Sequence, residues 1–134
     1  MRRVVVTGIG IVSSIGNDAG QVADSLRNAR SGIVAAPEYK ELGFRCQVHA
    51  PPKLDWQSQV DRRAARFLES GLGYGHIAME QAIADSGLTP EDVSNERTGL
   101  IFGAGGPSTK AIVGVADTTR SKGPKRVGPF AVPK

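Results

Sequence analysis

The sequence predicts an α/β fold, in which helices pack against a sheet of buried strands. Two apolar segments, 3–8 and 98–103, have the composition of buried strands, and each runs into a turn that contains glycine. The elements follow in the order strand, helix, strand, long helix, strand, helix. With 134 residues, the chain is long enough for one domain with its own core and too short to argue for two.

The first strand and the first helix have clear signals. A run of valines in 3–8 ends in glycine, which is typical of a buried strand that feeds a tight turn. We expect a helix over 19–28, because Asn17 and Asp18 can cap its start and Gly32 lies beyond its end.

The shorter elements are read from alternation and from caps. Residues 35–55 are expected to form an extended excursion, in which 44–50 alternates as a short strand. Thr89 precedes a proline and two acidic residues, which predicts a short turn of helix. A further helix is expected over 108–119, after the second glycine-rich strand exit.

The longest predicted element is a helix over 61–86. Its apolar residues recur at steps of three, four and seven, and Gly87 lies where a helix commonly ends. Three glycines lie inside it, Gly71, Gly73 and Gly75, and each costs about 1 kcal/mol relative to alanine. Either the helix bends there, or another segment packs too closely for a side chain.

Composition excludes several classes of protein. The net charge of +4 and the few aromatic residues give no indication of nucleic-acid binding. No apolar run approaches the roughly 18 residues that a membrane helix needs. Gly8 and Gly10 interrupt the apolar stretch that could suggest a secretory signal. The single cysteine excludes an internal disulfide and fits a cytoplasmic location.

The glycines of the first strand exit are open to two interpretations. Gly8, Gly10 and Ser13 fall on the spacing of a dinucleotide-binding fingerprint, but serine replaces its third glycine. The helix starts too late for that motif, and no acidic residue ends a second strand about twenty residues on. We interpret these glycines as structural and keep a nucleotide-binding domain as a remote alternative.

The sequence offers no convincing catalytic or metal-binding residue. Cys46 and His49 are three residues apart, so on a strand they point to opposite faces. A lone cysteine is usually a small apolar filler. His76 in the long helix lacks a set of metal ligands around it. We therefore predict no catalytic residue, no metal site and no cofactor within the chain.

Two basic clusters remain. Arg62, Arg63 and Arg66 share one patch at the start of the long helix, where each opposes the helix dipole by roughly 0.3–1 kcal/mol. A solvated basic face is the simplest explanation. If the two clusters met in the fold, they would suit an acidic protein surface or a phosphate. The second cluster, on a flexible segment, comprises Arg120, Lys122, Lys125 and Arg126.

Several motifs follow one another along nearly the whole chain, in the segments 6–17, 31–33, 60–67, 79–88 and 127–130. Together they resemble β-ketoacyl-[acyl-carrier-protein] synthases. The Ser-Ser-Ile-Gly-Asn variant of the first motif is most similar to type I, the bacterial elongating enzyme.

The resemblance implies a thiolase-like fold with αβαβα layers, of which residues 1–134 would be the first part of the N-terminal half. It also implies a homodimer that elongates fatty acids by decarboxylative Claisen condensation of malonyl carrier protein with an acyl-enzyme thioester. The family's nucleophile is a cysteine at a helix N-terminus, assisted by two histidines. Cys46 does not match the nucleophile's position, and the chain holds no Ala-Cys-Ala or His-Gly-Thr motif. We therefore expect an inactive chain that stops before the nucleophile of a longer enzyme.

Some functional positions of the family do match this sequence. Gly106 and Phe130 match positions that line the acyl pocket, and Pro107 departs from the glycine expected beside them. An alternative hypothesis is a chain that docks acyl carrier protein without catalysis. The positions that match the carrier dock are Arg62, Arg63, Arg66, Lys122 and Lys125.

Overall fold

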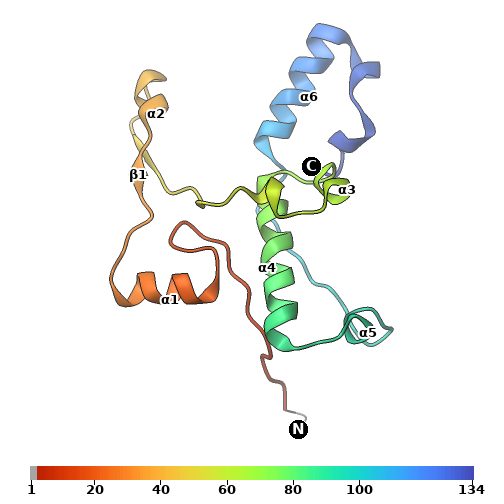
Figure 1. Cartoon of the computed structure of the whole chain (residues 1–134). Helices are drawn as coiled ribbons and strands as arrows, with labels where there is room; N and C mark the ends of the chain where they lie inside the picture. Colours follow the sequence, from red (N-terminus) through yellow and green to blue (C-terminus); the bar gives the residue numbers. More distant parts are fainter. Residues whose placement is uncertain (1–2) are drawn as a thin grey trace. The chain divides into compact units, whose positions relative to one another are not determined.

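A computed structural model describes residues 3–134, which fall into two compact units. The first unit comprises the chain up to Leu54 together with Ala78–Gly87. The second comprises Asp55–Ile77 and Leu88–Lys134. Helix α4 (Ser70–Ser86) contributes residues to both units, and Figure 1 shows it as one continuous helix. All the carrier-binding and acyl-pocket residues that we predict from the sequence belong to the second unit.

The first unit holds a helix and a small hairpin. The predicted helix over 19–28 is confirmed, and the side chain of Asp18 caps it by accepting a hydrogen bond of 2.8 Å from the Gln21 amide. The two strands pair antiparallel, with Val34 opposite His49. The elements of this unit, besides the end of α4, are α1 (Ala19–Arg27), β1 (Val34–Ala35), α2 (Pro37–Glu41) and β2 (Val48–His49).

The excursion over 35–55 is more structured than the sequence predicts. The expected strand over 44–50 is only two residues long, and helix α2 was not expected. Pro37 occupies the first position of α2, where its fixed φ favours a helix and its missing amide costs no hydrogen bond. The rings of Tyr39 and Phe44 then pack at 5.5 Å between centroids, which closes the loop that leads to β2.

The glycine-rich segment after the valines lies directly against α4. The Ile9 amide donates to the carboxylate of Asp85 at 2.9 Å, and the Ile11 amide donates to the Gln81 side chain at 3.0 Å. A side chain at Gly8 or at Gly10 would collide with the α4 backbone, at Ala82 and Ala78 respectively. The structural interpretation of these glycines is confirmed, because the helix backbone lies too close for a side chain at either position.

The second unit is built around Trp56, which is 8% exposed. Val60 and Ile77 are buried in the same unit. The predicted helical turn at Thr89 has a complete capping box, and the predicted helix over 108–119 extends to Lys122. Besides the start of α4, the elements are η1 (Trp56–Ser58), α3 (Arg62–Ala65), α5 (Pro90–Val93), α6 (Thr109–Lys122), η2 (Pro124–Arg126) and η3 (Pro129–Ala131).

The predicted helix over 61–86 is wrong in its first part, because α3 and α4 are separate helices. The Phe67 amide donates to the carbonyl of Ala64, three residues back, which tightens the chain at the end of α3. Phe67 then packs edge-to-face on Phe130, with ring centroids 5.0 Å apart. The apolar residues keep their helical spacing across this break, so the sequence pattern did not indicate that the helix ends there.

The glycines inside α4 are explained by close packing. A side chain at Gly73 would collide with the indole ring of Trp56, and one at Gly75 would lie 2.7 Å from the Phe102 ring. Gly71 has no atom within 4 Å of the place where a side chain would begin. The second of the two explanations offered by the sequence is therefore confirmed at Gly73 and Gly75.

The predicted strands over 3–8 and 98–103 are not formed within the described residues. Both segments are irregular, and Figure 1 draws neither as an arrow. Val6 is 90% exposed and Ile101 is 99% exposed. A central strand needs hydrogen-bonded neighbours, and β1 and β2 pair only with each other. Composition indicates which segments could form a strand, but it does not show whether another segment pairs with them.

The described chain is therefore a mixed structure with many helical residues and little strand. This arrangement does not reproduce the layers expected from the sequence. Within residues 3–134, no helix combines the length and the apolar character needed to cross a membrane.

Candidate functional site

The first basic cluster lies on α3 and at its end. Arg62 and Arg63 belong to the helix, and Arg66 is its C-cap. All three are exposed, and none takes part in an ion pair within residues 3–134. The carboxylate of Asp61 accepts hydrogen bonds from the Arg63 amide at 2.8 Å and the Ala64 amide at 3.3 Å. Asp61 is therefore bonded to backbone amides, and the guanidinium groups remain available to a partner.

The dipole argument made for these arginines does not hold in the structure. Helix α3 is a single turn of four residues, so Arg62 and Arg63 lie in its last turn as well as its first. The field of so short a helix is small compared with that of the long helix expected from the sequence. Exposure and the lack of ion pairs, rather than an unfavourable dipole, make this cluster a candidate interface.

The second basic cluster lies at the C-terminal end of α6 and in the turn that follows it. Lys122 is the last residue of α6, and Lys125 lies in η2 after Gly123. Gly123 has φ of +84°, a conformation that favours glycine and turns the chain sharply after the helix. Both lysines are exposed, whereas Arg120 pairs with Asp117 at 3.6 Å. Lys122, Lys125 and Arg126 therefore carry the available charge, without an ion pair among the described residues.

Contacts of the C-terminal segment join the α3 cluster to the start of α6. Phe67 packs on Phe130, and the Lys134 ammonium lies 3.5 Å from the carboxylate of Glu69. The carbonyl of Lys134 accepts a hydrogen bond of 3.4 Å from the amide of Ser108, which caps α6. The 14 residues of α6 then span about 20 Å. Both clusters belong to the second unit. The contacts above hold the start of α6, whereas Lys122 is its last residue, so the length of this helix separates the second cluster from those contacts.

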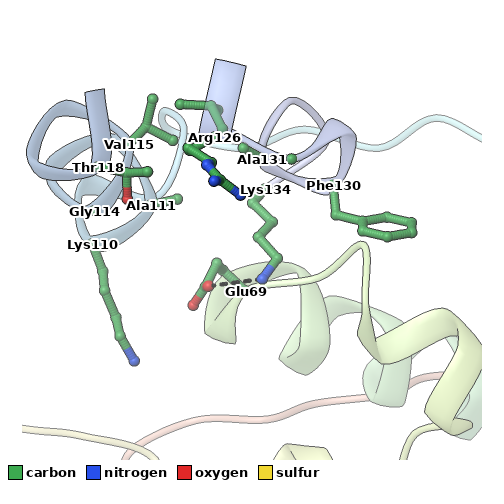
Figure 2. A pocket seen from close by; sticks show the side chains of 12 residues that line it. Glu69, Lys110, Ala111, Gly114, Val115, Thr118, Arg126, Phe130, Ala131 and Lys134 are labelled. Atoms are coloured by element: carbon green, nitrogen blue, oxygen red, sulfur yellow. Dashed lines mark ion pairs between the residues drawn. The ribbon is translucent and has the colours of Figure 1, made fainter. Parts of the chain in front are cut away.

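Two open cavities in this unit hold the predicted pocket residues. A cavity of about 330 Å³ is lined by Phe130, and one of about 810 Å³ is lined by Gly106. Glu69, Lys110 and Lys134 line both. Figure 2 shows Lys134 extended toward Glu69 in the smaller cavity, while Phe130 projects from η3 at its side. No pattern in the sequence indicated these three charged residues, because they lie far apart in the chain and match no motif.

Gly106 borders open space. No atom lies within 4 Å of the position where a side chain would begin, so a substitution there would extend into the cavity without striking the protein. The neighbouring Pro107 lines the same cavity and has no amide hydrogen to donate. The size of this cavity therefore depends on the missing side chain at position 106.

The remaining candidates do not come together. Cys46 is exposed, and its thiol lies 3.6 Å from the carbonyl of Val48. His49 contacts the ring of Tyr39 and lies 3.9 Å from the carboxylate of Glu38. Within residues 3–134, no group of three or more histidine, cysteine or acidic side chains is placed to hold a metal ion.

The family model described as "Beta-ketoacyl synthase, N-terminal domain" matches residues 1–134. The chain therefore belongs to the β-ketoacyl synthase family, as the motifs of its sequence indicated. Membership of this family implies a thiolase-like fold, although the described residues do not display its layers.

Among curated proteins, the chain is similar to 3-oxoacyl-[acyl-carrier-protein] synthase 1 of Escherichia coli K12, with 48% identity over 136 residues. The protein of that name from Haemophilus influenzae is 43% identical over 135 residues. The synthase 2 of Vibrio cholerae is less similar, at 32% over 133 residues. All or nearly all of this chain is covered, but only 34%, 33% and 32% of those proteins. The chain thus spans about a third of the length of its curated relatives.

Proposed function

We propose that this chain is part of a 3-oxoacyl-[acyl-carrier-protein] synthase that elongates fatty acids. In that reaction, carbon 2 of a malonyl group attacks the carbonyl of an acyl-enzyme thioester, carbon dioxide leaves, and the enzyme thiolate is released. The proposal is supported by the family and by the similarity to relatives named synthase 1 rather than synthase 2. The proposal also includes the αβαβα layering of the fold, assembly into a homodimer and a cytoplasmic location.

The role proposed for this chain is to bind acyl carrier protein. The observation that supports it is the state of five basic side chains in one compact unit, all exposed and none in an ion pair among the described residues. A small acidic domain about 30 Å across could contact both ends of a helix about 20 Å long. The five residues are Arg62, Arg63, Arg66, Lys122 and Lys125.

The cavities that Gly106 and Phe130 line are proposed to form part of the acyl pocket. Gly106 would leave room for the growing chain, because no side chain enters the larger cavity from that position. Phe130 would present an apolar ring edge beside the smaller cavity. No residue of this chain is proposed to be catalytic, so the isolated chain is expected to be inactive.

A titration with purified acyl carrier protein tests the docking role. We expect binding at low salt that weakens as salt rises, and weakens by about tenfold or more in an Arg62→Glu, Arg66→Glu variant. The single variants Arg62→Glu and Arg97→Glu form the matched pair, because each reverses one charge and Arg97 is an exposed arginine of the same unit outside both clusters. An equal loss in both variants would mean that only the net charge matters. Unchanged binding in the double variant would refute the α3 interface.

A second measurement separates docking from catalysis. Decarboxylation of malonyl carrier protein by the 134-residue chain is expected to stay at the background rate. Turnover above that rate would contradict the proposal that no catalytic residue lies in this chain. The binding result would still stand, since it depends on different residues.

A further inference from the structure

A polar cavity in the first unit is not used by the proposed function. It has a volume of about 180 Å³ and lies between the turn at 13–17, the side of α1, residues 30–31 and Lys53. All of these residues belong to the first unit, whereas the carrier interface and the acyl cavities belong to the second.

The walls of this cavity are held by short contacts. Ser13 and Gly16 exchange backbone hydrogen bonds of 2.8 and 3.4 Å, and the Ser25 hydroxyl donates to the Ile15 carbonyl at 2.6 Å. The Asn17 side chain donates to the Lys53 carbonyl at 3.0 Å, which fixes Lys53 beside the turn. A side chain at Gly32 would collide with the backbone carbonyl of Ser14. The site is therefore shaped before any ligand arrives.

The side chains that line this cavity offer unused donors. The Lys53 ammonium makes no ion pair, and the Ser14 hydroxyl makes no hydrogen bond, within residues 3–134. The Ser31 hydroxyl accepts from the Ile33 amide at 3.1 Å and keeps its own proton to donate. Arg30 uses Nη1 on Asp24 at 2.7 Å, which leaves its other N–H groups. Lys53 therefore brings an unpaired positive charge to the cavity, and Arg30, whose charge is shared with Asp24, brings further N–H donors, so the cavity favours an anion.

The N-terminus of α1 takes no part in this argument. The Asp18 side chain accepts from the Gln21 amide at 2.8 Å, so a carboxylate already lies at this helix end. The Oδ1 atom of Asn17 is covered and has no hydrogen-bond partner among the described residues, and as an acceptor it is not used to bind the anion. The donors named above carry the inference alone.

We propose that this cavity binds a phosphate group through Lys53, Arg30, Ser14 and Ser31. Their donors come from three separate segments, which matches the several oxygens of a tetrahedral oxyanion better than the two oxygens of a carboxylate. The volume equals that of about six water molecules, so it accommodates the phosphate with a small substituent. Either inorganic phosphate or a phosphate monoester supplies this chemistry.

The test is a titration of the isotopically labelled chain with inorganic phosphate and, separately, with phenyl phosphate, at constant ionic strength. We expect saturable NMR shifts of the Ser14 and Ser31 amides. Lys53→Gln should raise the Kd by about tenfold, as for a lost charge-assisted hydrogen bond, and Ser14→Ala should raise it less. The control is Lys40→Gln, which removes the same charge from the same unit outside the cavity.

Tighter binding of phenyl phosphate would identify a monoester as the ligand, and tighter binding of the free ion would identify inorganic phosphate. The proposal is overturned if no amide shifts, if Lys53→Gln and Lys40→Gln weaken binding equally, or if acetate binds as well as phosphate. Circular dichroism of each variant establishes that its helices are intact. Because the site lies in the first unit, these results are independent of the carrier titration.

Discussion

The contact of Trp56 with Gly73 offers the sharpest test of how the second unit is packed. In a Gly73→Ala variant, the new methyl group would collide with atoms Cδ2 and Cε3 in the middle of the indole ring. Those atoms belong to a rigid, buried side chain, so the contact cannot be relieved by moving a flexible tip. Either the ring must turn away from α4, or the helix backbone must move.

Two opposing effects determine the magnitude. Overpacking a buried contact costs about 1–3 kcal/mol, and replacing glycine by alanine inside a helix gains about 1 kcal/mol. The net expected loss of stability for Gly73→Ala is therefore about 0–2 kcal/mol. Gly71→Ala is the matched control, because it lies on the same helix with no atom within 4 Å of the new methyl group. The control should gain up to about 1 kcal/mol, so the two variants should differ by about 1–3 kcal/mol.

The assay is chemical denaturation followed by both circular dichroism and fluorescence. Trp56 is the single tryptophan of the chain, so emission reports directly on the ring in question. We expect a red shift of the emission in Gly73→Ala and none in Gly71→Ala. In a Trp56→Phe background, which has a smaller ring, the cost of Gly73→Ala should fall, and a double-mutant cycle measures that difference.

The reasoning would be refuted by equal stabilities of the Gly73→Ala and Gly71→Ala variants with unchanged emission in both. It would also fail if the cost of Gly73→Ala were the same with Phe at position 56 as with Trp, because the clash would then not involve the indole. Either result would mean that α4 and Trp56 are not packed as the structure has them.

Gly10→Ala should destabilise the first unit by about 1–3 kcal/mol, since the new methyl group would collide with the α4 backbone; Gly114→Ala, with open space around it, should not. Comparing the two by denaturation tests this, and equal midpoints would contradict it. Hydrogen bonds from the amide and hydroxyl of Thr89 lower the pKa of Asp92 below its ordinary value of 3.8. The capping box should therefore be intact above about pH 4 and be lost as the pH falls through that lowered pKa. Asp92→Asn should remove this dependence of the Thr89 amide signal, and an unchanged titration would exclude Asp92 as its source.

Local signals in the sequence predicted the helices well where a cap and a period agree. Asp18 and Ser108 each cap a helix that the structure contains, and Thr89 begins a complete capping box. A cap acts within one turn of the chain, so its residues suffice to recognise it. The break between α3 and α4 was missed because Phe67, which lies in it, packs on Phe130, a residue more than sixty positions away.

The candidate site was predictable only in part. Motifs identified the basic residues, and the structure places all of them in one unit with exposed, unpaired charges among the described residues. The cavity residues Glu69 and Lys134 were not predictable, because their pairing depends on how the last residues of the chain return to the start of α4. The phosphate cavity likewise combines Ser14, Ser31 and Lys53 from separate segments.

The sequence alone determined the family, most helix starts and the identity of the basic residues, because each depends on neighbours in the chain. Only the tertiary structure shows which atoms lie too close to the glycines for a side chain. Gly10 and Gly73 look alike in the sequence, yet one meets helix backbone and the other an indole ring. Tertiary structure also determines whether apolar segments become strands. Val6 and Ile101 have strand-forming side chains, but a strand exists only where another backbone supplies its hydrogen bonds.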